Sequence, residues 1–263
     1  MVSDKFGQPR KTEIIYNIDE IQPETEEEEI PDYPVTVFIS KEGYLKKITQ
    51  QSLRMSGEQK LKEGDTMAQT VETTNRAEIL VFSDKFQCYK AKLNDFADGK
   101  ASQLGDYLPQ KLGFDAGENV AQVIFPGDYK GFALFFFENG KAAKVPLSAY
   151  ETKANRRKLT GAYCDKSPLV AAFSMSADAQ MAVYTNDGRC VIFSTAQLLP
   201  KTTRNTQGVG IVALKKKAIV SSVAPAEISG IVNMSRYRTR TLPSAGAILK
   251  DEDAPDKQIQ FDV

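Results

Sequence analysis

The chain has 263 residues, of which 41% are hydrophobic and 26% charged, an ordinary composition for a soluble globular protein that can bury a sizeable core. It contains no histidine, which excludes Ser-His-Asp and Cys-His nucleophile systems and histidine metal sites. No apolar run approaches the ~20 residues that a membrane helix needs. Three widely spaced cysteines, Cys88, Cys164 and Cys190, are interpreted as reduced thiols of a cytoplasmic protein.

A formal net charge of zero conceals an uneven distribution of charge along the chain. Residues 1–34 hold 3 basic and 10 acidic residues, and residues 250–263 hold 2 basic and 5 acidic residues. Residues 35–249 keep 29 basic and 19 acidic residues, a net charge of +10. A basic body with acidic ends suggests a polyanionic ligand such as nucleic acid, although acidic ends also serve simply to keep a basic fold in solution.

Residues 19–34, DEIQPETEEEEIPDYP, are predicted to be an acidic linker. Consecutive glutamates repel one another, and prolines interrupt both helices and strands. A solvated helix end is the alternative interpretation. A further hypothesis is that the two acidic ends of the chain lie on the basic body and compete with its ligand.

From residue 35 onward, an apolar strand followed by a turn and a returning strand recurs along the chain. The copies are VTVFISKEGYLKKI (35–48), EILVFSDKFQCYKA (78–91), FALFFFENGKAAKV (132–145), QMAVYTNDGRCVIF (180–193) and, more weakly, SGIVNMSRYRTRTL (229–242). Their turn residues are Gly43, Phe86, Gly140, Gly188 and Tyr237. Glu-Gly, Asn-Gly or Asp-Gly occupies three of these turns, so each copy is predicted to be a β-hairpin.

Further strand-like segments lie between the hairpins, within residues 67–74, 118–129, 167–176 and 211–227. Each repeat unit therefore holds about four strands. Units of this size and content are typical of propeller-like folds, in which blades stack because one blade cannot bury both faces alone. The aromatic stretch FALFFF (132–137) is expected to be strand core and not a base-stacking platform.

Basic residues recur on the second strand of the copies and just after it. They are Lys46, Lys47, Lys90, Lys92, Lys141, Lys144, Arg189, Arg236, Arg238 and Arg240. Because equivalent positions of successive blades face the same way, these side chains are predicted to form a belt on the rim that suits the line charge of DNA. The alternative is a solvated outer strand that uses lysine. The run ANRRK (154–158) adds Arg156, Arg157 and Lys158 as phosphate contacts or as part of an exposed loop.

Five stretches resemble the C-terminal domain of the A subunit of bacterial type IIA topoisomerases, the family of DNA gyrase and topoisomerase IV. They are KFGQPRKTEI (5–14), GYLKKI (43–48), GKAAKVPLSAY (140–150), TRNTQGVGIVALKK (203–216) and YRTRTLPSAGAILK (237–250). They occur in the order expected of the family and span nearly the whole chain. The fourth stretch adds Arg204 to the predicted DNA contacts.

The resemblance implies an all-β fold, a β-pinwheel of five four-stranded blades, or six, over residues 35–250. Residues 1–34 would be the end of the catalytic core and the acidic linker, and residues 251–263 an acidic tail. The implied partners are double-stranded DNA, the ATPase B subunit and the N-terminal core that precedes this domain in its parent protein, in the bacterial cytoplasm and away from any membrane. The piece by itself is expected to be monomeric.

The resemblance also implies that this chain is not catalytic. The nucleophilic tyrosine, the metal site and the ATP site belong to other regions or subunits, so ATP and Mg²⁺ would serve the parent enzyme only. The pair Arg236-Tyr237 looks like the Arg-Tyr pair of the catalytic core, but its flanking residues do not match that motif.

The sequence departs from gyrase at the box, approximately Gln-Arg-Arg-Gly-Gly-Lys-Gly, that gyrase needs to introduce negative supercoils. QSLRMSGEQKLKEGD (51–65) keeps Gln51, Arg54, Gly57, Lys60 and Lys62 but not the contiguous run. A degenerate box favours a topoisomerase IV-like protein, and a polar loop between blades is the alternative. A different class of function also stays open, a propeller that docks on another subunit or on a chromosome-organising protein.

Overall fold

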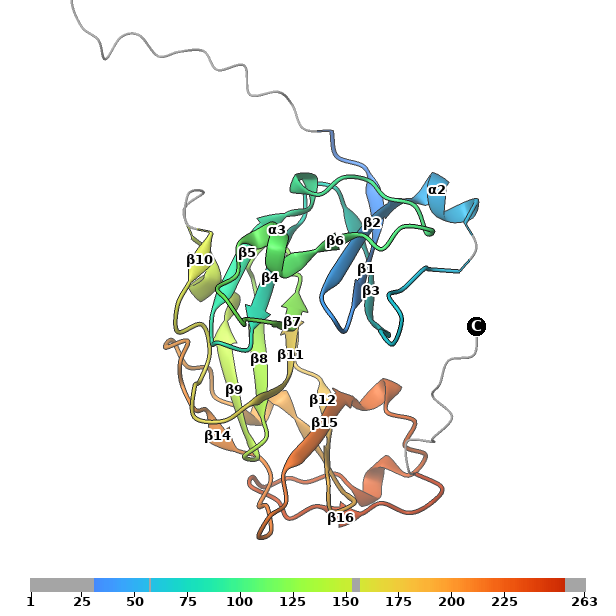
Figure 1. Cartoon of the computed structure of the whole chain (residues 1–263). Helices are drawn as coiled ribbons and strands as arrows, with labels where there is room; N and C mark the ends of the chain where they lie inside the picture. Colours follow the sequence, from blue (N-terminus) through green and yellow to red (C-terminus); the bar gives the residue numbers. More distant parts are fainter. Residues whose placement is uncertain (1–30, 57, 153–156, 254–263) are drawn as a thin grey trace, which may run out of the picture. The chain divides into compact units, whose positions relative to one another are not determined.

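The computed structural model describes residues 31–56, 58–152 and 157–253, which fold into four antiparallel four-stranded sheets (Figure 1). Blade A consists of β1 (Pro34–Ser40), β2 (Tyr44–Thr49), β3 (Met67–Thr74) and β6 (Asp106–Tyr107). Blade B consists of β4 (Glu78–Ser83), β5 (Cys88–Lys92), β7 (Val120–Ile124) and β10 (Lys158–Leu159). Blade C consists of β8 (Phe132–Phe137), β9 (Lys141–Pro146), β11 (Leu169–Met175) and β14 (Val209–Gly210). Blade D consists of β12 (Gln180–Thr185), β13 (Arg189–Ser194), β15 (Val220–Pro225) and β16 (Ala247–Ile248).

The first four predicted hairpins are confirmed, and each supplies the two central strands of one blade. All four turn residues have a positive φ, 88° at Gly43, 61° at Phe86 and 75° at both Gly140 and Gly188. Phe86 adopts this conformation without being glycine, which is uncommon. The shared geometry shows that the sequence alignment of the copies matches their structural register.

The fourth strand of a blade arrives late in the chain. β6 joins blade A only after the central hairpin of blade B, β10 joins blade B after the hairpin of blade C, and β14 joins blade C after the hairpin of blade D. Each of these strands has two residues. Neighbouring blades are therefore linked by exchanged strands, and strands this short carry too little pattern to be predicted from sequence.

The expectation of five or six blades is wrong, because the described residues form four. The weak fifth copy contains the 3₁₀ turn η6 (Met234–Arg236) and no strand among its described residues. Its supposed turn residue, Tyr237, is buried, and its backbone carbonyl accepts a hydrogen bond from the N–H of Ile192 at 2.7 Å. The segment therefore covers blade D and does not begin another blade.

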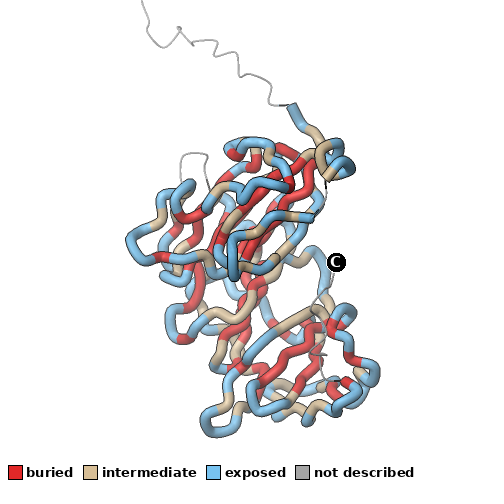
Figure 2. The backbone as a smooth tube through the Cα atoms, turned by 45° about the vertical axis from the view of Figure 1, so that its right-hand side comes forward, coloured by how far each residue is buried: buried red, intermediate tan, exposed pale blue. Residues whose placement is uncertain are grey.

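The blades stack because their central strands bury both faces. In β4, Leu80 and Phe82 belong to the core shared with blade C, whereas Ile79 and Val81 belong to the core shared with blade A. The central strands of blade C alternate in the same way between blades B and D. Figure 2 shows these buried residues running through the middle of each sheet. Residues 133–137 of the stretch FALFFF are core, as predicted, and burying each of its large side chains, Leu134 and Phe135 to Phe137, contributes roughly 1.5–3 kcal/mol.

The two outer faces of the stack are covered by local segments. Phe38 and Ile48 of blade A pack against Leu53 of the short helix α2 (Gln50–Arg54) and against Ala101. Tyr184 and Ile192 of blade D pack against residues 226–237. Both end blades therefore have a covered apolar face of their own.

Asp253 fastens the segment that covers blade D. Its carboxylate accepts hydrogen bonds from the backbone N–H groups of Val232 and Asn233, at 2.9 and 3.0 Å, and from the Tyr237 hydroxyl at 2.7 Å. The side chain is fully buried. The sequence placed this residue in an acidic tail beginning at 251, but the packed part of the chain includes it.

Glycines allow three of the four last-added strands of the blades, β6, β14 and β16, to lie close to the neighbouring strand. Gly105, Gly208 and Gly246 immediately precede β6, β14 and β16, and all have positive φ. A Cβ atom at Gly208 would lie 1.9 Å from the carbonyl oxygen of Ala142, so a larger residue cannot let the strand approach. The corresponding oxygens for Gly105 and Gly246 belong to Leu45 and Cys190, at the same position of their hairpins.

We expect Gly208→Ala to destabilise the fold. The left-handed conformation alone costs a non-glycine residue about 1–2 kcal/mol, and the clash with Ala142 adds to this. The matched control is Gly117→Ala. Gly117 has φ +72 and open space around it, so this substitution should cost only the free energy of the left-handed backbone conformation. Urea unfolding measures the free energy of unfolding of both variants. Equal decreases would show that the close approach of residue 208 to Ala142 does not add to the destabilisation.

We expect Asp253→Asn to lower the melting temperature at pH 7. The N–H of Asn233, and next the Tyr237 hydroxyl, hold the pKa of Asp253 below its usual value. A carboxylate with a depressed folded pKa stabilises the fold at neutral pH and loses this effect as pH falls through that pKa. In thermal scans, the difference between the two proteins should therefore shrink below about pH 4. A difference independent of pH would contradict this account.

Candidate nucleic-acid interface

Three of the cations predicted to form the rim belt are buried. Lys46, Lys47 and Lys144 are 3%, 3% and 6% exposed. The ammonium group of Lys46 donates to the backbone carbonyls of Lys60 and Ala101, at 2.9 and 3.2 Å, and burial lowers its pKa. The belt interpretation is therefore corrected for these three residues, since their charged ends are used inside the protein.

A lysine recurs at the fourth residue after the turn in blades A, B and C, and it forms an ion pair each time. Lys47 lies 3.1 Å from Asp98, Lys90 lies 2.9 Å from Glu78, and Lys144 lies 2.6 Å from Asp178. In blade D this position is Ile192, which packs in the apolar cover of that blade. The repetition of lysine thus has a structural cause, a cation held between a blade and its neighbouring segments.

Aromatic rings complete two of these sites in the same way. The ring of Tyr33 lies 5.9 Å from Lys47 Nζ and its hydroxyl donates to Asp98. The ring of Tyr129 lies 5.2 Å from Lys90 Nζ and its hydroxyl donates to Glu78. Each tyrosine therefore offers its negative face to the cation and its hydroxyl to the partner carboxylate.

The third site replaces the tyrosine hydroxyl by a threonine. Phe132 lies 4.6 Å from Lys144 Nζ, and the Thr195 hydroxyl donates to Asp178 at 2.6 Å. Lys144 and then Thr195 hold the pKa of Asp178 below its usual value. The three acids occupy non-equivalent positions of their repeat units, so aligning the copies could not reveal them.

The other predicted cations that the structure describes reach the surface. Arg54, Lys60, Lys62, Lys92, Arg157, Arg236, Arg238 and Arg240 are exposed. Lys90, Lys141, Lys158, Arg189 and Arg204 are partly buried. Arg156 lies outside the described residues. Exposed cations therefore occur on blades A, B and D of this set.

Most of the partly buried cations have protein partners. Lys141 donates to Gln207 at 2.8 Å, Lys158 lies 2.8 Å from Asp115, and Arg189 lies 3.3 Å from Asp187. Arg204 donates to the carbonyl of Ala149 at 3.1 Å. These side chains can approach a phosphate only in competition with the partners that they already have.

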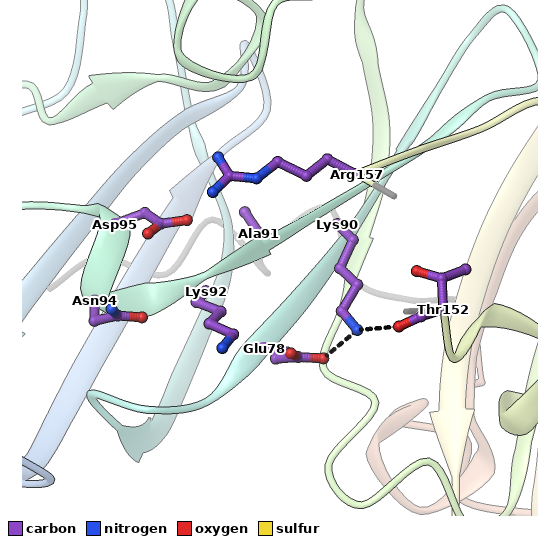
Figure 3. A pocket seen from close by; sticks show the side chains of 8 residues that line it. All are labelled: Glu78, Lys90, Ala91, Lys92, Asn94, Asp95, Thr152 and Arg157. Atoms are coloured by element: carbon purple, nitrogen blue, oxygen red, sulfur yellow. Dashed lines mark hydrogen bonds and ion pairs between the residues drawn. The ribbon is translucent and has the colours of Figure 1, made fainter. Parts of the chain in front are cut away.

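A recess of about 470 Å³ on blade B collects several of the predicted residues (Figure 3). Lys90 lines it but is occupied by Glu78 and by the carbonyl of Thr152. Lys92 and Arg157 line it from different segments, β5 and the residues just before β10. Their two cationic groups make no ion pair with any residue that the structure describes.

The segment aligned with the gyrase box begins as the helix α2. Thr49 caps this helix, accepting from the Ser52 N–H, and exposed Arg54 ends it. Lys60 is tied to blade A through its backbone, since its N–H donates to the carbonyl of Ala101 at 2.8 Å. Lys62 pairs with Glu42 at 2.6 Å, and Gly57 lies outside the described residues.

Two negative findings apply to the described part of the chain. No group of three or more Cys, Asp or Glu side chains there could hold a metal ion. None of its helices is long and apolar enough to cross a membrane.

We expect Lys144→Met to lower the stability of the fold, and to affect DNA binding only through that loss of stability. The substitution leaves Asp178 without its charged partner, and hydrogen bonds to charged groups contribute about 1.5–3 kcal/mol. The matched control is Lys92→Met, which removes an exposed cation and should leave the urea midpoint nearly unchanged. Weakened DNA binding by Lys144→Met with an unchanged midpoint would contradict the structural assignment.

Comparison with known proteins finds relatives of this chain among topoisomerases. No protein-family model matches the chain. The chain is 26% identical over 224 residues to the A subunit of DNA topoisomerase 4 from Staphylococcus epidermidis, and 25% identical to the same protein from Staphylococcus aureus. Each alignment covers 83% of this chain and 28% of the relative. The chain therefore spans less than a third of the length of the curated relatives that it matches.

The fold is shared with solved structures, of which two are compared here. The crystal structure of the C-terminal domain of DNA topoisomerase IV has a TM-score of 0.70 and 18% identity, covering 85% of this chain and 76% of that one. The DNA gyrase A C-terminal domain has a TM-score of 0.57 and 16% identity, covering 84% and 80%. Sequence and fold agree: over 83% of its length the chain is similar to topoisomerase 4 A subunits, and its fold is that of the C-terminal domains of type IIA topoisomerase A subunits.

Proposed function

We propose that this domain binds and bends duplex DNA, and presents one segment of it for strand passage by the rest of the topoisomerase. The observation that carries the proposal is the net charge of +10 over residues 35–249, together with exposed cations on several blades. Lysine and arginine side chains that reach phosphates release condensed counterions, which drives binding with little regard to sequence. Any sequence preference would then come from how easily the DNA bends.

The domain contributes no catalytic group in this proposal. Tyr237, the only tyrosine that follows an arginine directly, is buried, and its hydroxyl donates to Asp253 at 2.7 Å. Burial raises the pKa of Tyr237, which disfavours the phenolate that a nucleophile needs. Strand cleavage, Mg²⁺ and ATP are assigned to the ATPase B subunit and to the remaining domains of the parent protein, in the bacterial cytoplasm.

We further propose a topoisomerase IV-like role in preference to supercoiling by wrapping. The segment 51–65 carries Arg54, Lys60 and Lys62, but they are not a contiguous basic run, and Lys62 is already paired with Glu42. This segment therefore offers fewer unpaired positive charges than a contiguous basic box would, and so holds tightly wrapped DNA less well.

A protein-docking function is the second candidate, favoured by one observation. Ile228 and Val232, which belong to the segment 226–237 that covers blade D, are 73% and 82% exposed. Exposed apolar side chains suit a protein partner better than a phosphate backbone. Binding to such a partner would depend weakly on salt.

The first test is binding of the chain to a duplex of about 150 base pairs, one persistence length, with a fluorophore at each end. We expect affinity to fall ~10³–10⁵-fold between 50 and 200 mM salt if 6–10 phosphates are contacted. Energy transfer between the ends should stay low, because the altered box does not support a tight wrap.

Each other result has a definite meaning. Salt-sensitive binding that draws the DNA ends together would refute the topoisomerase IV-like role and indicate gyrase-like wrapping. Absence of binding at 50 mM salt would refute the DNA proposal and leave the docking surface near Ile228 and Val232 as the candidate.

A further inference from the structure

We propose that one end of blade D is a docking site for an acidic segment of another protein, held by Lys215, Lys216 and Lys217 and by an apolar contact with Ile248. This inference goes beyond the proposed function, because it concerns a protein ligand at the end of a single blade. It depends neither on DNA binding nor on the exposed apolar residues of the segment that covers blade D.

One tight turn recurs before β3, β7 and β15, each of which pairs with the first strand of the hairpin of its blade (Figure 1). The turns are residues 62–65, 115–118 and 215–218. In each, the backbone N–H of the fourth residue donates to the carbonyl of the first, at 3.0, 3.1 and 3.0 Å. Each strand begins at the second residue after its turn. The three turns are therefore equivalent parts of blades A, B and D.

The tight turn lies beside the hairpin turn of the same blade. The carbonyl of the residue that follows it, Thr66, Asn119 or Ile219, accepts from the backbone N–H two residues before the hairpin turn residue, at 2.9, 3.0 and 3.0 Å. Blade C has the same hydrogen bond, from Glu138 to Pro168 at 3.1 Å. Both turns of a blade thus form one surface, which we call its turn end.

Blade D places a lysine where blades A and B have glycine. The third residue of the tight turn has a positive φ in all three, 81° at Gly64, 72° at Gly117 and 69° at Lys217. This conformation is unfavourable for any residue but glycine, and strain of this kind is a reason to look for a function. Lys217 is exposed, so burial does not account for its side chain. A ligand for its ammonium group would.

The turn end of blade D also differs from the other three in charge. It has 3 basic residues and 1 acidic residue, against 2 and 3 in blade A, 1 and 3 in blade B, and 1 and 2 in blade C. Positive charge therefore dominates at one turn end only. The turn ends comprise residues 41–43 with 62–65, 84–86 with 115–118, 138–140 with 164–167, and 186–188 with 215–218.

The charges of blade D line a recess of about 440 Å³. Residues 215–217 are exposed there and form no ion pair with any residue that the structure describes. Asp187, the one acid in the lining, is engaged by the Thr185 hydroxyl at 2.5 Å and by Arg189 at 3.3 Å. The three lysines therefore remain available to carboxylates from outside.

An apolar side chain completes the recess. Ile248 of β16 lines it, is 60% exposed, and lies opposite Arg189 in the sheet. Ile219, just after the tight turn, is 39% exposed. Apolar surface among cations suits a peptide that carries both carboxylates and a branched aliphatic side chain.

The same observations favour a peptide over duplex DNA at this place. A duplex carries about one negative charge per 1.7 Å of its axis, so one that ran along the turn ends would pass three surfaces where acids outnumber bases. A short acidic peptide needs only the turn end of blade D.

Charge-matched variants of the full chain test the proposal. The probe is a fluorescein-labelled peptide of four glutamates around a central leucine, followed by fluorescence anisotropy at low salt. The first variant carries K215Q, K216Q and K217Q. The control carries K41Q, K85Q and K166Q, one lysine from each of the other turn ends. Both lose three charges, and thermal unfolding checks that both remain folded.

We expect the blade D variant to bind the peptide at least about threefold more weakly, and the control to change by less than about twofold, since one exposed ion pair contributes roughly 1.4- to 5-fold. Equal losses in the two variants would overturn the assignment, because they would show general attraction between charges. Absence of peptide binding by the unaltered chain would also overturn it.

Two single substitutions separate binding from packing. Lys217→Gly gives blade D the residue that blades A and B have, so peptide binding should weaken while the urea midpoint does not fall. A lower midpoint would show that Lys217 serves the fold and would overturn the argument from strain. Ile248→Ser should weaken binding as well, and unchanged binding would indicate a site for anions in general.

Two further measurements identify the occupant. If duplex DNA displaces the peptide, and the blade D variant loses more affinity for the duplex than the control does, the turn end binds phosphate and the proposal is overturned. Tighter peptide binding by a chain with E26Q, E27Q, E28Q and E29Q would show that its own acidic segment fills the site, which overturns a separate partner. Failure of the unaltered chain to bind DNA would refute the proposed function and leave this inference intact.

Discussion

The structure depends on the burial of both faces of each central hairpin. A strand with one apolar face can form a blade that stands alone, but β4 divides its side chains between two neighbours, and β8 does the same. Neither hairpin can satisfy its apolar surface without a blade on each side. The apolar outer faces of the two end blades must therefore be covered by other segments. Residues around Leu53 cover blade A, and residues around Tyr237 cover blade D.

This constraint explains why the sequence revealed the four hairpins so clearly. Runs such as FALFFF are apolar at consecutive positions because both faces are covered, and Gly140 or Gly188 marks the turn that follows. The third strands, for example Met67–Thr74, were also visible as strand-like segments. The two-residue strands were not, since no periodicity can be read over two positions. The fifth copy resembles a hairpin in sequence but is not one, because its apolar residues pack onto blade D without a partner strand.

The candidate site could be predicted only in part, for an electrostatic reason. Sequence shows that Lys47 and Lys144 recur, but it does not show whether an acid lies beside them. Their partners come from segments that the fold alone brings near, so solvent-facing and interior lysines look alike in the alignment of copies. A repeated cation is evidence for a repeated environment, and that environment can be a carboxylate of the protein itself as readily as a phosphate.

The late arrival of the fourth strands has a consequence for synthesis of the chain. Blade A lacks its edge until Asp106 and Tyr107 emerge, by which time the hairpin of blade B is complete. Blades A, B and C are thus each completed only after the hairpin of the next blade has been made, and until then their sheets keep an open edge. Shortening the protein at an apparent boundary between blades would also strip a strand from the blade before it. The repeat units of this domain are therefore separable in the sequence but not as folding modules.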